Sequence, residues 1–200
     1  MQNSIQLIKL ENSDYNKKIL IIGVFHGDEP QGEYFINSYL KNSPQSGVNS
    51  LYFIPRLNFN NVRQNFNGVD LNRNFPAKNW VLGEKNDYFG GYEPNSEYET
   101  QYLVKLIDEN NFDAIITIHS PYKTVNYDGP AKDLARFISK ILGYPVSSDI
   151  GYATPGSFGT YCGKERNIPT ITIEIDENED IELLNSKFAD LFNRLKNDYI

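Results

Sequence analysis

Residues 19–29 read Ile-Leu-Ile-Ile-Gly-Val-Phe-His-Gly-Asp-Glu, an apolar run followed directly by a polar tetrapeptide. An apolar run of this length predicts a buried strand, which we place at residues 18–25. The polar residues then lie just beyond the carboxyl end of that strand, where open α/β sheets bind their ligands. His26 and Glu29 are three residues apart, so an imidazole nitrogen and a carboxylate oxygen can face one point. Both groups are ligands that zinc accepts.

The second histidine of the chain occupies a similar place. His119 is the only other histidine, and it follows the apolar run at residues 114–118. Two histidines at the ends of two predicted strands indicate a shared metal site, in which three protein ligands leave one position open. The structural alternative stays open at this point, because a His-x-x-Glu pair is common and a histidine at a strand end is often only hydrogen-bonded.

Length and composition describe an ordinary globular protein. The chain has 200 residues, of which 40% are apolar and 22% charged, and we expect one domain over residues 1–200. The net charge of −7 argues against nucleic acid or an anionic membrane as a partner. Cys162 is the only cysteine, so no intrachain disulfide can form. The first residues carry no basic signal-peptide region and no long apolar segment follows, which predicts a cytoplasmic protein.

Strands and helices are predicted to alternate along the chain. Further strands are expected at residues 5–10, 51–54, 114–119 and 170–175, and helices at residues 31–40, 131–142 and 181–199. This order predicts an α/β domain with a mixed, mostly parallel sheet flanked by helices on both faces. Another helix is expected to begin at the capping-box spacing of residues 96–99 and to run to residue 110. We expect its stripe of Tyr98, Tyr102, Leu106 and Ile107 to face the core.

Two further places in the sequence carry candidate chemistry. Glu174 alternates with isoleucines in the strand at 170–175, and a carboxylate among them is costly unless it is paired or used. It is either a solvent-facing residue at a strand end or a general base. Arg63, Asp70 and Arg73 lie in a long irregular segment at residues 58–76. Arginine can bind a carboxylate through two parallel hydrogen bonds, although both arginines could equally be ordinary surface cations.

The stretch GVDLNRNFP at residues 68–76 strongly resembles the signature of the zinc metallocarboxypeptidases. In that family a His-x-x-Glu precedes the signature, a single strand histidine follows it, and a glutamate lies near the end of the domain. The resemblance therefore implies that His26, Glu29 and His119 bind one zinc ion. It implies that Glu174 is the general base and later the proton donor to the leaving amine. Arg63 corresponds to the arginine that stabilises the tetrahedral oxyanion.

The same resemblance implies how substrate is held. Asn72 and Arg73 would bind the carboxylate of the residue being released. Asp70 matches a carboxylate that hydrogen-bonds the first zinc histidine and so fixes its tautomer and orientation. Tyr152 resembles the mobile tyrosine that closes over bound substrate.

The sequence is most similar to a small bacterial branch of that family, the murein peptide amidases. Residues 151–159, GYATPGSFG, are similar to the glycine-rich loop of this branch. The resemblance implies a cytoplasmic enzyme that removes diaminopimelate from the γ-D-glutamyl amide of recycled cell-wall peptides. Its partner would be a small peptide with a free carboxylate. The chain departs from many relatives at residues 58–61, which read Asn-Phe-Asn-Asn in place of Asn-Pro-Asp-Gly.

Two alternatives remain at this point. Aspartoacylases and succinylglutamate desuccinylases share His-x-x-Glu and an Asp-Leu-Asn-Arg core but hydrolyse N-acyl amino acids. A catalytically silent domain that binds peptidoglycan could also keep this fold, and loss of a ligand or of the base would be its mark. The full signature and the glycine-rich loop favour the amidase.

Overall fold

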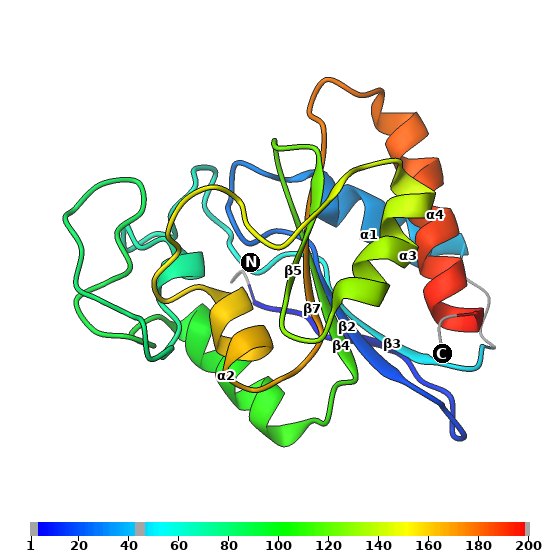
Figure 1. Ribbon diagram of the computed structural model, residues 1–200, viewed down its shortest axis with the longest axis horizontal. Coiled ribbons are helices and arrows are strands. Elements are labelled where there is room, and N and C mark those ends of the chain that lie inside the picture. The colour runs from blue at the N-terminus through cyan, green and yellow to red at the C-terminus, as the bar shows by residue number, and fades with distance from the viewer. Residues whose placement is uncertain (1–3, 43–46, 199–200) are drawn as a thin grey trace.

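The computed structural model describes residues 4–42 and 47–198, which form one mixed β-sheet with helices on both faces (Figure 1). Within these residues the sheet has seven strands in the order β1-β3-β2-β4-β7-β5-β6. The strands are β1 (Ile8–Leu10), β2 (Lys18–Ile22), β3 (Ser50–Ile54), β4 (Ala114–His119), β5 (Thr124–Asp128), β6 (Val146–Ser147) and β7 (Thr170–Glu174). The predicted fold class is confirmed.

The four central strands of the sheet are parallel, and the strands at its two margins run in the opposite direction. Strand β2 pairs in parallel with β3 and β4, and β4 pairs in parallel with β7. Strand β1 is antiparallel to β3, and β5 is antiparallel to β7. Residues 19–22 of β2 have no exposed surface, because a central parallel strand is covered on both faces. This is why its sequence is a continuous aliphatic run.

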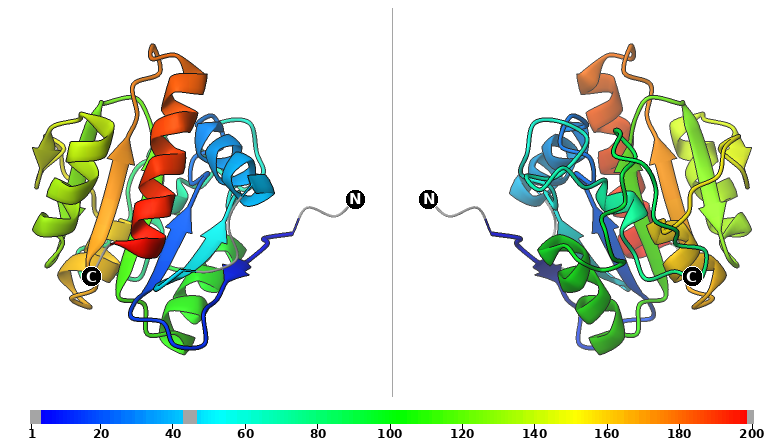
Figure 2. Two further views of the ribbon diagram at one scale, coloured as in Figure 1. Left: turned by 90° about the vertical axis from the view of Figure 1, so that its right-hand side faces the viewer. Right: turned by 90° about the vertical axis from the view of Figure 1, so that its left-hand side faces the viewer.

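The two faces of the sheet are covered differently. Helices α1 (Gln31–Asn42), α3 (Lys132–Leu142) and α4 (Ile181–Asn197) pack on one face, which we call the three-helix face (Figure 2). The other face is covered by α2 (Tyr98–Glu109) and by the segments at residues 57–77 and 158–168. We call it the loop face. These segments include a short 3₁₀ turn at Leu71–Arg73 and a π-helical turn at Thr160–Lys164.

The carboxyl ends of β2 and β4 open onto one crevice. The chain leaves β2 through α1 on the three-helix face and reaches β4 through α2 on the loop face. Adjacent strands with connections on opposite faces form a topological switch point, where α/β sheets bind ligands. Gly23, just after β2, packs directly against Gly32 in the first turn of α1. A Cβ on Gly23 would overlap the backbone of Gly32, and a Cβ on Gly32 would overlap the backbone of Gly23, so this contact fixes the start of α1 against β2. The turn at residues 26–30 is thereby held at the crevice.

Several predicted details differ from the structure. Ser96 is not the cap of α2; Glu97 takes that position without a capping hydrogen bond from its side chain, and Ser96 Oγ donates to Glu97 Oε1. Tyr98 is 66% exposed, so the predicted stripe is wrong at its first residue. The physical reason is Asn74, whose Oδ1 accepts hydrogen bonds from Thr100 Oγ1 and from the backbone of Glu97. These bonds turn the Thr100 side of the helix inward.

The element limits also shift. The predicted strands at 5–10 and 18–25 are shorter in the structure, and strands β5 and β6 were not predicted. The helix stop signal predicted at Gly143 is present: Gly143 adopts a left-handed conformation with φ 79° at the end of α3.

Two predictions fall partly outside the described residues. Residues 1–3 belong to the signal-peptide prediction, and Tyr199 to the predicted last helix. No helix in the described part of the chain has the length and hydrophobicity needed to cross a membrane.

Candidate active site

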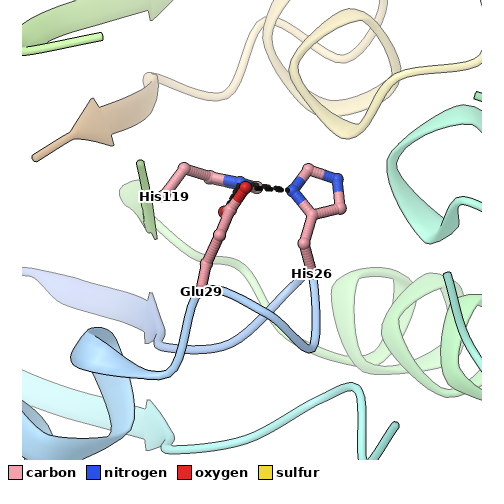
Figure 3. A group of neighbouring side chains, drawn as sticks. All are labelled: His26, Glu29 and His119. Carbon is pink, nitrogen blue, oxygen red and sulfur yellow. Dashed lines mark hydrogen bonds and ion pairs between the residues drawn. The ribbon is translucent and has the colours of Figure 1, made fainter. Parts of the chain in front are cut away.

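Three side chains from two strand ends meet at the crevice. His26 and Glu29 lie on the turn between β2 and α1, and His119 is the last residue of β4 (Figure 3). His26 Nδ1 lies 2.9 Å from Glu29 Oε1 and 3.3 Å from His119 Nδ1, and His119 Nδ1 lies 3.0 Å from Glu29 Oε2. All three residues are buried. The structure therefore brings the three predicted ligands together.

The spacing of these donor atoms fits a zinc ion. Ligands at about 2.0–2.1 Å in a tetrahedron are about 3.3 Å from one another. The three separations of 2.9, 3.0 and 3.3 Å are close to that value. Two imidazole nitrogens and a carboxylate also make a donor set that zinc accepts. His26, Glu29 and His119 could therefore hold the metal.

Asp70 determines how His26 presents its ring. Asp70 is fully buried, and its Oδ1 lies 3.2 Å from His26 Nε2 and accepts from the backbone of Asn72 at 2.9 Å. Arg63 donates from Nε to Asp70 Oδ2 at 3.0 Å. Because an ionised carboxylate can only accept, the proton of His26 belongs on Nε2 when a metal is bound. The Nδ1 lone pair then faces the metal site.

The electrostatics of the site follow from these contacts. Burial opposes the charged form of His26, but the charges and hydrogen bonds of Asp70 and Glu29 outweigh it and raise the pKa of His26 to about 9. Burial likewise opposes ionisation of Glu29, but its bonds to His119 and His26 lower its pKa to about 2. The opposite charges of His26 and Glu29 therefore stabilise one another within the cluster.

Glu174 ends strand β7 directly beside this cluster. It pairs in register with His119, and it is 6% exposed. Burial and the charge of Glu29 raise the pKa of Glu174 to about 8. Its Oε2 atom has no hydrogen-bond partner within residues 4–42 and 47–198. A buried carboxyl with a raised pKa and a free oxygen in a cleft is a candidate acid–base group.

The other predicted residues surround the same cavity, which has a volume of about 250 Å³. Its walls include Asn72, Arg73, Arg63 and Tyr152, next to the three candidate metal ligands. Arg63 Nη1 lies 4.0 Å from Glu29 Oε1, so its free end faces the candidate ligands. The structure therefore places Arg63 at the site although residues 58–61 depart from the common sequence.

Arg73 is a buried cation without a carboxylate partner in the described residues. Its side chain is nearly enclosed, and Nη1 donates to the carbonyl of Asn72 at 2.7 Å. The rings of Tyr88 and Tyr152 lie 5.8 and 6.0 Å from its guanidinium carbon. Asn72 Oδ1 accepts from the backbone of Phe158, which fixes the turn beside Arg73. A buried guanidinium in this position can bind an anionic group of a ligand.

Tyr152 lies at the rim of the cavity. It is 42% exposed, and its ring centroid lies 6.4 Å from that of Tyr122. Its loop runs over residues 148–157, between β6 and the π-helical turn. A half-exposed aromatic ring on such a loop can cover a ligand in the cavity.

Sequence reasoning missed several residues near the site. Asn126, Asp128 and Thr172 line the cavity, and Tyr88 lies 4.8 Å from the guanidinium carbon of Arg63. A signal for two of them exists, because residues 124–128 alternate polar and apolar, as a strand with one solvated face does. Tyr88 lies in the loop at 79–95, which carries no motif.

The mixed sheet thus gathers two histidines and two glutamates near the ends of β2, β4 and β7, with arginines in the same cavity, and these side chains make a donor set suited to a zinc ion. The profile of the family described as zinc carboxypeptidase matches residues 49–136. Murein peptide amidase A of Vibrio campbellii is 32% identical over 176 residues, which is 80% of this chain and 70% of that protein. The chain belongs to the zinc carboxypeptidase family.

Other relatives agree with this assignment. Murein peptide amidase A of Escherichia coli K12 is 37% identical over 125 residues, or 56% of this chain and 51% of that protein. The crystal structure of murein-tripeptide amidase from Escherichia coli O157 matches 94% of this chain and 84% of its own, with a TM-score of 0.82 and 27% identity. Carboxypeptidase A from Helicoverpa armigera shares the fold, with a TM-score of 0.75 at 14% identity over 96% of this chain and 63% of its own.

Proposed function

We propose that the protein is a single catalytic domain with one zinc ion, which hydrolyses the amide bond before the C-terminal residue of a small peptide. The observation that carries this proposal is Arg73, a buried guanidinium in the same cavity as His26, Glu29 and His119. A free carboxylate at the end of a peptide would give Arg73 the partner it lacks. The amide bond that precedes the C-terminal residue would then lie beside the three candidate metal ligands.

The best substrate candidate is a γ-D-glutamyl-diaminopimelate peptide, from which the enzyme would release diaminopimelate. Similarity to murein peptide amidase A from two organisms supports it. We further propose that the enzyme acts in the cytoplasm on recycled cell-wall peptides, as the resemblance of residues 151–159 implies.

The proposed roles follow from the positions of the side chains. A zinc ion at this site would polarise the scissile carbonyl and lower the pKa of water. Glu174, with its unpartnered oxygen, would accept a proton from the attacking water and pass it to the leaving amine. The guanidinium of Arg63 would face the negative charge that develops on the carbonyl oxygen.

Three other residues would position the reactants. Asn72 and Arg73 would hold the terminal carboxylate, since both line the cavity within one turn of the chain. Asp70 would keep His26 in the tautomer that offers Nδ1 to the metal. Tyr152 would close over the bound peptide from the rim.

The two alternatives have less support. A silent binding domain would be expected to lack a ligand or the base, whereas His26, Glu29, His119 and Glu174 are all present around one crevice. An N-acyl amino acid hydrolase is disfavoured by the similarity to murein peptide amidases over most of the chain.

The test is product analysis with zinc-loaded protein. The enzyme is incubated with γ-D-glutamyl-diaminopimelate peptides, N-acetylaspartate and N-succinylglutamate, and products are identified by mass spectrometry. We expect free diaminopimelate and the shortened peptide. Hydrolysis of the N-acyl amino acids in preference to the peptides, or binding of the peptides without turnover, would refute the proposal.

A further inference from the structure

The ring of Tyr88 contacts both arginines that line the cavity. Its centroid lies 4.8 Å from the guanidinium carbon of Arg63 and 5.8 Å from that of Arg73. Both separations are within about 6 Å, the range in which an aromatic ring attracts a cation. Tyr88 comes from the loop at residues 79–95, to which the proposed function assigns no role. A single ring from this loop thus links the two cations of the site.

The turn that carries this ring is anchored on both sides. Asn86 Oδ1 accepts from the backbone of Tyr88 at 2.8 Å, and Gln64 Nε2 donates to the carbonyl of Asn86 at 2.7 Å. The backbone of Asp70 donates to the carbonyl of Phe89 at 2.8 Å, and the side chain of Phe89 is buried. Tyr88 is itself 52% exposed, but the residues around it hold its backbone in place.

The same turn is connected to the backbone beside each arginine. A Cβ at Gly90 would overlap the carbonyl oxygen of Arg73, so these two backbones are in direct contact. Asn74 Nδ2 donates to the carbonyl of Gly90 at 2.7 Å. Gln64 and Asn74, which bind the turn, each follow one of the two arginines in the chain. Tyr88 and both arginines therefore share one backbone framework.

Hydrogen bonds within the protein leave part of each guanidinium for a ligand. Arg63 uses Nε and Nη2 for Asp70, at 3.0 and 2.9 Å, and its Nη1 lies 4.0 Å from Glu29. Arg73 donates from Nη1 to the carbonyl of Asn72 and has no carboxylate partner in the described residues. A ring contact engages the charge of a guanidinium but takes up none of its N–H donors, so these stay available for a substrate.

Tyr88 and Tyr152 both lie near Arg73, but they are held differently. The ring of Tyr152 lies 6.0 Å from the guanidinium carbon of Arg73, on the loop at residues 148–157 that we expect to close over bound substrate. Tyr88 lies on the anchored turn at residues 86–90. Its contact with the guanidinium is therefore the one that persists when the ring of Tyr152 moves.

We propose that Tyr88 is a positioning residue, which holds the guanidinium groups of Arg63 and Arg73 where the reacting carbonyl and the terminal carboxylate of one substrate meet them. This inference rests on the proposed function, which assigns those two roles. An arginine that is already ordered loses less conformational freedom when it binds an anion. Because Arg63 acts on the transition state and Arg73 on the bound substrate, loss of the ring should lower kcat and raise KM.

Two substitutions at Tyr88 test the role of the ring in hydrolysis by zinc-loaded protein. Tyr88→Phe keeps the ring, whereas Tyr88→Leu keeps an apolar side chain without it. A cation–π contact corresponds to about two- to thirtyfold in an equilibrium constant, so Tyr88→Leu should lose about tenfold in kcat/KM on a peptide with a free carboxylate. Tyr88→Phe should stay within about threefold of wild type. The matched control is Tyr92→Leu, 65% exposed on the same loop, which should leave kcat/KM unchanged.

The pattern of the kinetic effects decides the inference. Thermal unfolding midpoints should be unchanged in all these variants, since half of the Tyr88 side chain is exposed. A loss in Tyr88→Phe as large as that in Tyr88→Leu would contradict the inference, because the ring would not be the group that matters. A change in KM alone, or in kcat alone, would overturn the proposal that one ring serves both arginines.

Chemical labelling measures the positioning without any reaction of a peptide. Substrate-free, zinc-loaded protein is treated with phenylglyoxal, which reacts with guanidinium groups, and the labelled fragments are quantified by mass spectrometry. Labelling of Arg63 and Arg73 should be at least about threefold faster in Tyr88→Leu than in wild type and Tyr88→Phe, because a guanidinium without the ring is less ordered. Arg194 on α4, paired with Asp190, is the internal control. Unchanged labelling with lost activity would show that Tyr88 does not act through the arginines.

The two measurements separate failure of this inference from failure of the proposed function. Faster labelling of both arginines in Tyr88→Leu, without hydrolysis of any peptide by the wild type, would refute the proposed function and leave the positioning contact standing. Hydrolysis by the wild type, with equal kcat/KM and equal labelling in Tyr88→Leu, would keep the proposed function and overturn this inference.

Discussion

The two faces of the sheet use the same strands for different purposes. On the three-helix face, Ile171 and Ile173 of β7 pack into a continuous core with Phe188 of α4. On the loop face the alternate residues of the same strand are Thr172 and Glu174, which line the cavity. One side of β7 is therefore an apolar core, and the other is a polar wall that includes a buried acid with a raised pKa.

This difference separates stability from chemistry by side-chain direction. The loop face also has an apolar cluster, around Phe25, Phe75 and Leu103, but its cavity wall carries the groups that are costly to bury. Changes to the polar residues of that cavity should affect reaction and metal binding more than folding. Changes on the three-helix face should do the opposite.

The strongest expected effect on the loop face comes from Glu174→Gln. The change keeps the shape but removes the proton acceptor, so turnover should fall by a factor of about 10² to 10⁴. Zinc content and muropeptide binding should be largely kept, and all three are measured on the same zinc-loaded sample. The matched control is Glu182→Gln on α4, which should keep activity. Turnover within a few-fold of wild type would show that the base is elsewhere.

The corresponding change on the three-helix face is Phe188→Ala. Phe188 is fully buried and stacks on Phe35 with ring centroids 4.4 Å apart. Its removal leaves a cavity, and we expect a loss of about 3–5 kcal/mol in the free energy of unfolding. Urea unfolding measures this loss, with Leu183→Ala as an exposed control on the same helix. A fall in activity per folded molecule as large as that of Glu174→Gln would break the division between the faces.

Arg73→Ala tests the carboxylate site on the loop face. Losing one partner of a buried charge pair costs about 2–5 kcal/mol, which corresponds to about 30-fold or more in kcat/KM on a peptide with a free terminal carboxylate. The variant should also discriminate less between that peptide and its C-terminal amide. Arg73→Lys is the control that keeps the charge but not the planar fork. Equal hydrolysis of acid and amide by the wild type would exclude a carboxylate clamp.

Asp70→Asn should have a smaller effect, limited to metal binding. The variant weakens the acceptor that holds His26 Nε2, and loss of such a contact typically costs 10- to 100-fold in metal affinity, by order of magnitude about 1–3 kcal/mol. Competition with a zinc chelator measures it. Unchanged affinity would mean that Asp70 serves mainly Arg63 and the turn at Leu71–Arg73.

The three-helix face could be predicted from the sequence almost completely. Strand alternation at residues 170–175 and the helical spacing of α3 and α4 have one physical cause, the burial of one side of each element. The aliphatic run of β2 and the histidine at the end of β4 also followed from local pattern. Local pattern therefore located the candidate ligands, although it could not establish that they meet.

The loop face could be predicted only in part. Strand β5 was missed because Asn126 and Asp128 are residues that strands disfavour, and their placement depends on pairing with β7. Tyr98 was misplaced because Asn74, 24 residues earlier in the chain, decides which side of α2 faces inward. Tyr88 reaches Arg63 and Arg73 from a loop without a motif. For Tyr98 and Tyr88, contacts between distant segments decide the position of the side chain, and the local pattern does not show them.

The central claim is that His26, Glu29 and His119 form a zinc site at the switch point of the sheet. Metal analysis of the wild type and of His119→Ala, purified in parallel and dialysed against the same zinc buffer, tests it most directly. We expect about one zinc per wild-type chain, in line with a three-ligand site, and a clear loss of zinc from the variant with its fold retained by circular dichroism. Full zinc occupancy in His119→Ala would contradict the account.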